Sequence, residues 1–322
     1  MVDDIQVSVP VIGIRDLADD GRALAELDAA CRDWGFFQVV DHGVDDGLIS
    51  SVHEQMRAFF ALPRHEKTKI LRTRTNVWGY YDHELTKNTP DWKEIFDVGP
   101  AEAEGPVAGA MPQWPDALPE FKAVLNAYID ACRNVANRLL AAIALNLSVP
   151  PSELTAAFGS DDSSFLRLNY YPLCADPAPA DAETMPASGH LGINHHTDAG
   201  ALTVLIQNDQ PGLQVLRNGV WRLVEPRADA LVINIGDIVQ VWSNDRYTAP
   251  LHRVLANSER VRYSAAFFFN PSYETDYAPL PRLCNADSPP RYRPINWGRF
   301  RAGRAAGDYA DYGKEIQISD FR

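Results

Sequence analysis

The chain has 322 residues, of which 46% are hydrophobic, and a formal net charge of −13 at pH 7. This length is enough for one large domain with a substantial core, so we expect residues 1–322 to form a single domain. The negative charge repels phosphate backbones, and no lysine- or arginine-rich block interrupts it. These properties exclude nucleic acid as the expected partner and favour a small-molecule substrate.

The cysteines and the apolar stretches indicate the compartment. Cys31, Cys132, Cys174 and Cys284 are scattered without Cys-x-x-Cys spacing, which is typical of free thiols in a reducing compartment. The chain shows no basic N-terminal region followed by an apolar run, and no uninterrupted apolar stretch long enough to span a bilayer. We therefore expect a cytoplasmic protein with no membrane partner, whereas its oligomeric state is not predicted.

The first half of the chain shows helical periodicity. Asp45 and Asp46 precede one apolar set and are expected to cap its helix. The Pro-, Gly- and Ala-rich segment from Pro100 to Pro119 predicts a surface loop. Apolar residues from Phe121 to Ile143 then trace one face of a long helix, which we expect to pack on a sheet. The two earlier apolar sets at helical spacing are Leu24, Leu27, Cys31 and Trp34, followed by Ile49, Val52, Met56, Phe59 and Phe60.

From Phe165 onward the pattern changes to short strands. Ala201 to Gln207 is apolar enough for a buried strand, and Val261 to Phe269 is a second strand-like run. Asn218-Gly219 separates two further runs and predicts a hairpin turn. Asp176 to Ser188 reads as a mobile loop. Short strands at regular intervals indicate a closed or double-sheet antiparallel architecture.

Three residues have the spacing of an open metal site. In an extended chain, residues i and i+2 project to the same side, so His196 and Asp198 can reach one ion while His195 and Thr197 point away. His252 lies downstream between apolar residues, in another strand-like segment. Two imidazoles and one carboxylate form the facial triad of non-heme Fe(II) oxygenases, which leaves the opposite coordination positions open. We therefore predict that His196, Asp198 and His252 bind a catalytic metal.

A second pair suits an anion. Arg262 and Ser264 stand two residues apart in the predicted strand, so both side chains lie on the same side. The planar fork of an arginine gives a carboxylate two charge-assisted hydrogen bonds, and the hydroxyl gives a third. The pair therefore predicts a carboxylate-binding site.

With these motifs the sequence resembles the isopenicillin N synthase-like branch of the Fe(II)/2-oxoglutarate-dependent dioxygenases. The resemblance covers nearly the whole chain, and together its motifs are highly specific. Asp41 departs from the pattern, since asparagine is commoner there, at a predicted turn. The matching segments are Val9 to Ile12, Trp34 to Val44, Trp92 to Glu94, Leu166 to Pro172, the His196/Asp198/His252 set and the Arg262-x-Ser264 pair.

The resemblance implies a fold and a division of the chain. It implies a mainly β fold with helical additions, in which a double-stranded β-helix (jelly roll) core packs against the long helix. We expect a helix-rich N-terminal region over 1–160, the jelly-roll core with the metal site over 161–280, and a C-terminal tail over 281–322. The tail is expected to fold back over the mouth of the barrel.

The resemblance also implies the cosubstrates and their ligands. Iron would be held by the triad, and the 2-oxo acid end of 2-oxoglutarate would chelate it, leaving one position for dioxygen. Arg262 and Ser264 would hold the distal carboxylate, with Asn169 and Tyr171 as helpers near the cosubstrate. The implied reaction hydroxylates an unactivated carbon of a small molecule and releases succinate and CO2. Because Asp198 is present, no room is left for a halide on the metal, which favours hydroxylation over halogenation.

Other functions share parts of this pattern. An oxidase, desaturase or cyclase of the same fold would use the same triad, and an oxidase could use Arg262 and Ser264 for a substrate carboxylate without 2-oxoglutarate. A cupin-like binding protein is the second alternative, although a closed structural metal site would normally have no vacant positions. The substrate itself is not predicted, because we expect its selection to fall to Val77–Tyr81, Asp176–Ser188 and the tail from Tyr309.

Overall fold

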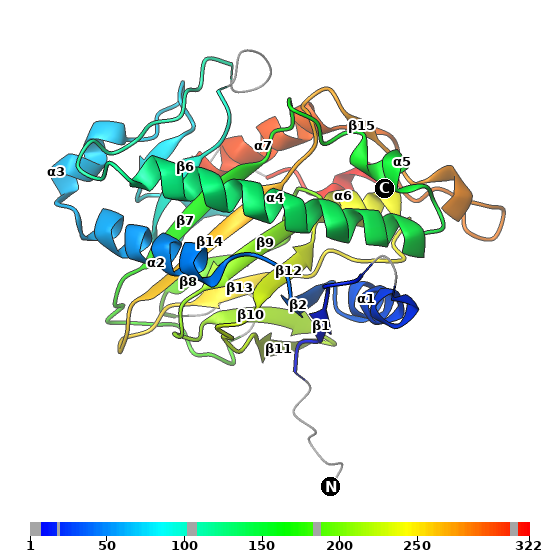
Figure 1. Ribbon diagram of the computed structural model, residues 1–322, viewed down its shortest axis with the longest axis horizontal. Coiled ribbons are helices and arrows are strands. Elements are labelled where there is room, and N and C mark those ends of the chain that lie inside the picture. The colour runs from blue at the N-terminus through cyan, green and yellow to red at the C-terminus, as the bar shows by residue number, and fades with distance from the viewer. Residues whose placement is uncertain (1–7, 18–19, 102–107, 183–187, 310–314) are drawn as a thin grey trace, which may run out of the picture.

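A computed structural model describes residues 8–17, 20–101, 108–182, 188–309 and 315–322. Two mainly antiparallel sheets face one another across an interior, and a long helix runs along the outside of the larger one (Figure 1). The two sheets share a buried apolar cluster that includes Phe36, Leu213, Val232 and Val254. This arrangement is the double-stranded β-helix that the family resemblance implies.

The larger sheet has eight strands, and only β1 and β2 pair in parallel. Its strand order is β1 (Val11–Gly13), β2 (Phe36–Val40), β12 (Leu231–Ile235), β9 (Leu202–Gln207), β14 (Arg262–Phe269), β7 (Phe165–Tyr171), β6 (Glu94–Val98) and β3 (Gly79–Tyr81). Four of these strands come from the helix-rich N-terminal region, which therefore contributes to the central sheet as well as to the helices outside it.

The smaller sheet carries the rest of the barrel wall. Its order is β11 (Val220–Leu223), β10 (Leu213–Arg217), β13 (His252–Leu255) and β8 (Leu191–His196). Asn218 and Gly219 join β10 to β11 with φ angles of 50° and 76°, the left-handed turn that this dipeptide predicts. Two small ribbons pair β4 (Leu85–Thr86) with β5 (Thr89–Pro90) and β15 (Asp276–Tyr277) with β16 (Ile295–Asn296).

The helices confirm the periodicity of the sequence. Asp45 caps the second helix, since its carboxylate accepts a hydrogen bond from the backbone N–H of Leu48. The longest helix, α4, spans the predicted apolar face. Of the described helices, none is both long and apolar enough to cross a membrane. The α-helices are α1 (Gly21–Asp33), α2 (Asp46–Ala61), α3 (Arg64–Lys67), α4 (Phe121–Asn146), α5 (Pro151–Thr155), α6 (Asp237–Trp242) and α7 (Trp297–Tyr309), and the 3-10 turns are Thr68–Ile70, Pro281–Leu283 and Ile318–Phe321.

Strand alternation gives the large sheet two different faces. In β14, Ala265, Phe267 and Phe269 belong to the main core cluster, in which α4 also takes part. The alternate residues of the same strand line a cavity between the sheets. The same alternation holds in β7, β9 and β12, because successive side chains of a strand point to opposite faces. One face of the large sheet thus builds the core under α4, and the other builds a site.

The C-terminal tail expected over 281–322 contains regular secondary structure. Residues 281–322 contain β16, the 13-residue helix α7 and two 3-10 turns. The α7 sequence alternates arginine, alanine and glycine without a continuous apolar stripe, so its periodicity did not reveal it. Its first residue, Trp297, is fully buried, and its indole N–H donates to the hydroxyl of Ser163 at 2.8 Å. The helix is therefore anchored to the body of the protein.

Candidate active site

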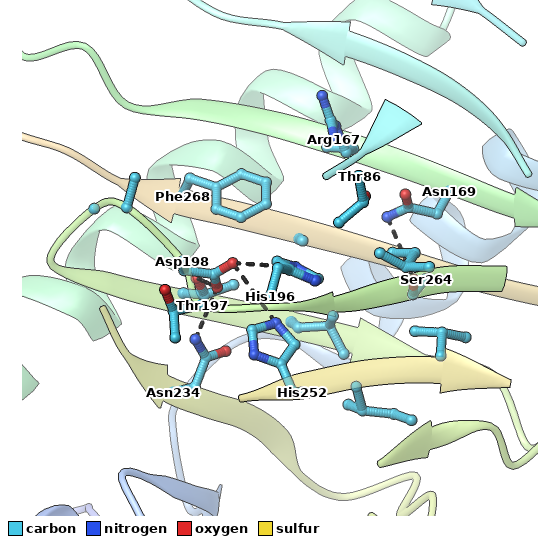
Figure 2. A pocket seen from close by; sticks show the side chains of 18 of the residues that line it. Thr86, Arg167, Asn169, His196, Thr197, Asp198, Asn234, His252, Ser264 and Phe268 are labelled. Atoms are coloured by element: carbon cyan, nitrogen blue, oxygen red, sulfur yellow. Dashed lines mark hydrogen bonds and ion pairs between the residues drawn. The ribbon is translucent and has the colours of Figure 1, made fainter. Parts of the chain in front are cut away.

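The cavity lies between the two sheets and is lined by residues from both. The larger sheet contributes alternate residues of β7, β9, β12 and β14, and the smaller one contributes β8 and β13. Figure 2 shows His196, Asp198 and His252 turned toward one another, with Asn169 and Ser264 farther along the same cavity. The site therefore has two parts, the triad and the Arg262–Ser264 pair. Strand alternation turns the side chains of both parts toward the same cavity.

The three predicted ligands converge. One ligand atom from each of His196, Asp198 and His252 lies within 4.8 Å of the others. Nε2 of His196 and Nε2 of His252 each lie 3.6 Å from Oδ1 of Asp198. The two histidines lie on neighbouring strands, where His252 in β13 is the register partner of His196 in β8. Two imidazoles and one carboxylate around one point have the donor set that Fe(II) takes in oxygenases.

Backbone carbonyls fix the tautomers of the two histidines. Nδ1 of His196 lies 2.8 Å from the carbonyl of Asn194, and Nδ1 of His252 lies 3.2 Å from the carbonyl of Pro250. A carbonyl can only accept, so each Nδ1 carries the hydrogen and each Nε2 keeps its lone pair. This is how metal-binding histidines are oriented. The imidazoles present unprotonated nitrogens at the point where the three side chains meet.

The charges around the triad favour the metal-binding protonation states. Burial and the neighbouring His252 ring hold the pKa of His196 well below its ordinary value. Burial alone would raise the pKa of Asp198, but His252, His196 and two hydrogen-bond donors lower it. A neutral imidazole and an ionised carboxylate are the forms that bind divalent metals.

His195 is placed apart from the triad, as the i, i+2 argument predicts. Its side chain is 8% exposed, and it is absent from the triad and from the residues that line the cavity. It lies between Asn194 and His196 at the end of β8, where alternate side chains face opposite ways.

Arg262 and Ser264 form the second end of the site. Arg262 is fully buried, and burial lowers the pKa of its guanidinium. Its Nη2 donates to Oε1 of Gln207 at 2.7 Å, and Nη1 lies 3.5 Å from the hydroxyl of Ser264. Among the described residues no carboxylate pairs with Arg262, and its Nε has no hydrogen-bond partner there. A buried cation without an acidic partner is costly, so the arrangement suits an anion from outside the chain.

Asn169 and Tyr171 lie beside this arginine. Asn169 in β7 is opposite Ser264 in β14, and its Nδ2 is 3.5 Å from the Ser264 hydroxyl. The amide oxygen of Asn169 is buried without a hydrogen-bond partner in the described chain. The guanidinium of Arg262 stacks over the Tyr171 ring, 4.9 Å from its centroid. Asn169 and Tyr171 therefore both line the cavity beside Arg262.

A network of buried charges forms one wall of the cavity. Glu84 binds Lys93 at 2.6 Å and Arg167 at 2.7 Å, and Arg167 also donates two hydrogen bonds of 2.8 Å to Asp97. Although burial would raise it, the pKa of Glu84 is about 2 because of Arg167, Lys93 and Arg72. Arg167 is thus held by two carboxylates. The sequence did not indicate Glu84 or Asp97, since nothing local marks charges that meet only after folding.

The same network reaches the triad through Asp91. Its Oδ1 accepts hydrogen bonds of 3.0 Å from both the backbone and the side-chain N–H of Asn194. Lys93 lies 3.1 Å from the other oxygen, and the hydroxyl of Thr86 donates to it at 2.7 Å. The carbonyl of that same Asn194 accepts from His196. Asp91 therefore anchors the end of β8 next to a triad residue.

The end of the cavity away from Arg262 is lined by aromatic and basic side chains. Phe165 and Phe268 stack with ring centroids 4.8 Å apart, and the Arg301 guanidinium lies 5.4 Å from the Phe165 centroid. Arg304 donates to the backbone carbonyl of Thr197 at 2.9 Å, and it binds Glu315 at 3.0 Å. The described part of the C-terminal tail thus contributes Arg301, Arg304 and Glu315 to the lining of the cavity.

The other segments expected to select the substrate give a mixed result. Trp78 and Tyr80 are 3% and 1% exposed and do not line the cavity, so these two core residues form no substrate wall. Of the loop Asp176–Ser188, residues 183–187 lie outside the described part of the chain. The loop residues before position 183 are held by hydrogen bonds, because Arg253 donates to the backbone carbonyls of Ala180 and Ala182.

A double-stranded β-helix that brings two histidines and one carboxylate together defines a non-heme iron oxygenase. Sequence profiles agree: the 2OG-Fe(II) oxygenase superfamily matches residues 163–271, and the N-terminal region of the non-haem dioxygenase in morphine synthesis matches residues 9–117. Flavanone 3-dioxygenase 2 of Oryza sativa subsp. japonica is 36% identical over 310 residues, covering 92% of this chain and 84% of that protein. Jasmonate-induced oxygenase 4 of Arabidopsis thaliana is 31% identical over 306 residues, covering 93% and 82%.

Solved structures give the same result. JOX2 in complex with 2OG, Fe and JA has a TM-score of 0.81 at 30% identity, covering 98% of this chain and 88% of that one. A full-length Neurospora crassa protein in complex with alpha-KG and thymine has a TM-score of 0.78 at 25% identity, covering 95% and 98%. The chain belongs to the 2OG-Fe(II) oxygenase superfamily and is an Fe(II)- and 2-oxoglutarate-dependent dioxygenase. The resemblance to the isopenicillin N synthase-like branch is confirmed.

Proposed function

We propose that this dioxygenase hydroxylates an unactivated carbon of a small organic molecule. Substrate, O2 and 2-oxoglutarate would give the hydroxylated product, succinate and CO2. The observation that carries the proposal is one cavity that holds both the His196/Asp198/His252 triad and the buried Arg262, to which no described carboxylate is paired. The metal would be held by Nε2 of each histidine and by the carboxylate of Asp198.

The cosubstrate site follows from the contacts at the other end. The distal carboxylate of 2-oxoglutarate would replace the missing acidic partner of Arg262, and the Ser264 hydroxyl would donate a further hydrogen bond. Asn169 and Tyr171 would lie against the cosubstrate from β7. When bound, iron and 2-oxoglutarate together supply the oxidising chemistry. The residues of the chain orient the target carbon and keep water out of the buried cavity.

Asp198 supports hydroxylation over halogenation. A halide on the metal would need the position that the Asp198 carboxylate faces, and this carboxylate is 7% exposed and hydrogen-bonded in place. Desaturation and ring closure use the same ligand set, so the distinction between these outcomes depends on where the substrate carbon sits.

The cavity wall supports a substrate with an apolar body. Phe165 and Phe268 offer flat apolar surface at the end away from Arg262, and Arg301 adds a positive charge beside it. Among the relatives, JOX2 was solved with JA, and the rice protein is named for a flavanone. We propose a substrate of comparable size and mixed apolar and polar character.

Two further points of the proposal concern the whole chain. We propose that residues 1–322 act as one domain, which is supported by a central sheet that draws strands from both halves of the chain. We propose a cytoplasmic location, supported by four free cysteines, three of them buried.

The proposal is tested by measuring succinate and product together. The purified protein is incubated with Fe(II), 2-oxoglutarate and O2 and with a panel of aromatic and terpenoid acids. We expect slow succinate release without substrate, faster release with a substrate, and one added oxygen atom in the product by mass spectrometry. Substrate conversion at the full rate without 2-oxoglutarate would instead establish an oxidase. Absence of any Fe(II)-dependent succinate release would reject the dioxygenase assignment of these residues.

A further inference from the structure

The two oxygens of Asp198 have different surroundings. Oδ2 accepts hydrogen bonds from the hydroxyl of Thr203 and from Nδ2 of Asn234, the latter at 2.7 Å. Oδ1 faces the two histidines, with each Nε2 at 3.6 Å. In Figure 2 the side chain of Asn234 points toward Asp198 and is joined to it by a dashed line. Oδ2 of Asp198 is thus hydrogen-bonded to the protein, whereas Oδ1 faces the two histidines of the triad.

The two donors are built into the centre of the large sheet. Thr203 in β9 and Asn234 in β12 are direct partners in the antiparallel register. Their side chains are 3% and 4% exposed, and both strands are paired on either side. Asp198 itself lies in the short connection between β8 and β9, where the strands alone do not fix a side chain. The donors therefore hold a loop carboxylate with the rigidity of two central strands.

We propose that Thr203 and Asn234 are positioning residues that reserve Oδ2 and so make Asp198 a ligand through one oxygen only. Carboxylates can bind a metal through one oxygen or through both. The triad would then fill three of six positions, 2-oxoglutarate two, and one would stay open for O2. A carboxylate free to turn would bring its second oxygen to the metal and take that last position. The inference rests on the proposed function of the triad.

Metal binding tests the proposal without turnover. Co(II) is titrated into the apoprotein, and the affinity and the visible absorption spectrum of bound Co(II), which reports its coordination geometry, are recorded. Thr203→Val and Asn234→Ala should each weaken Co(II) binding by about 10- to 100-fold and change the spectrum. Thr203→Ser keeps the hydroxyl, so its Co(II) affinity should be within a few-fold of that of the wild type. Its bound Co(II) should also give the wild-type spectrum. This rescue separates a hydrogen bond from a general packing effect.

Thr155→Val is the matched control. Thr155 also donates a hydroxyl hydrogen bond, at 3.1 Å to the carbonyl of Pro151 in α5, but it does not line the cavity. Its variant should keep the wild-type spectrum, and thermal unfolding of every apoprotein shows which variants are folded. If Thr203→Val does not fold, the Co(II) affinity and spectrum of Asn234→Ala and Asn234→Ser are compared with those of the wild type instead.

The outcomes separate the inference from the proposed function. Wild-type protein that binds neither Co(II) nor Fe(II) would contradict the triad assignment itself. Wild-type binding together with unchanged affinity and spectra in folded Thr203→Val and Asn234→Ala would overturn only the role of the two donors. An equal loss in Thr203→Ser and Thr203→Val would also overturn it, because the hydroxyl would then be irrelevant.

Discussion

Gln207 accepts a hydrogen bond of 2.7 Å from Nη2 of Arg262, and this bond sets the direction of the guanidinium. Gln207 lies in β9, in register with Ser264 of the neighbouring β14. The arginine is thereby held from the adjacent strand, while its Nε has no partner in the described chain. A fixed fork with unused donors suits a carboxylate in one orientation.

Arg262→Lys should therefore weaken the use of 2-oxoglutarate without removing the metal. Lysine keeps the charge but loses the fork, so we expect the KM for 2-oxoglutarate to rise by about 10- to 100-fold. Ser264→Ala should raise it by about fivefold, the equivalent of about 1 kcal/mol for one hydrogen bond. Arg260→Lys is the control, because Arg260 is an exposed arginine two residues away that pairs with Asp209. Equal effects in both lysine variants would contradict the assignment.

Replacing the triad histidines should abolish metal binding selectively. His196→Ala and His252→Ala each remove one of three ligands, and we expect loss of turnover and a sharp fall in Fe(II) affinity. His195→Ala should leave Fe(II) affinity within a few-fold, since its side chain does not line the cavity. Fe(II) titration monitored by calorimetry measures all three. A comparable loss in the His195 variant would move the ligand assignment.

The Glu84 network should give the protein an acid-sensitive component of stability. The folded-state pKa of Glu84 is about 2, below the ordinary value of 4.5. Ionised Glu84 therefore contributes on the order of 3 kcal/mol to the free energy of unfolding above about pH 4.5, and this contribution is lost as the pH falls toward 2. Glu84→Gln should lower the free energy of unfolding at pH 7 by about 3–5 kcal/mol, because the buried Lys93 and Arg72 and the partly buried Arg167 lose a partner.

Denaturant unfolding between about pH 3 and pH 7 measures this effect. The wild type should lose stability more steeply than Glu84→Gln on the acid side, since the variant lacks the titrating carboxylate. Parallel curves for the two proteins would show that Glu84 does not titrate as its surroundings indicate.

The C-terminal tail should govern coupling rather than cosubstrate binding. Glu315→Gln weakens the 3.0 Å pair with Arg304, whose Nη2 also donates to the carbonyl of Thr197 between two triad residues. We expect a higher substrate KM and more succinate per product, with the KM for 2-oxoglutarate unchanged. Glu259→Gln changes an exposed glutamate and should behave as the wild type. A normal succinate-to-product ratio in Glu315→Gln would exclude this role of the tail.

Local patterns predicted the parts of the site whose residues are close in sequence. The i, i+2 spacing was sufficient for His196 with Asp198 and for Arg262 with Ser264, because strand geometry alone puts each pair on one side. The long helix and the Asn218-Gly219 turn were also predicted from local patterns, the first from the helical spacing of apolar residues and the second from a dipeptide that favours a hairpin turn. His252 is 54 positions beyond Asp198, so it was indicated by its apolar, strand-like context and not by local spacing.

The supporting contacts were not predictable in this way. Asn234, Gln207 and Asp91 are single polar residues whose partners come from other strands, and only the folded register brings them together. A signal existed for Asn234, the one polar residue of β12, and for Gln207, which shares β9 with only one other polar residue, Thr203. A buried polar group in such a strand needs a partner, although the sequence does not say which one.

The alternation of β14 restricts how this enzyme can change over evolution. Deleting one residue within the strand would turn Ala265 and Phe267 into the cavity and press Ser264 and Phe268 against α4, so folding and chemistry would fail together. Length changes are therefore confined to the connections between strands. Within the strands, a new substrate can be acquired only by exchanging one cavity-facing side chain for another, and each such exchange leaves the face beneath α4 untouched.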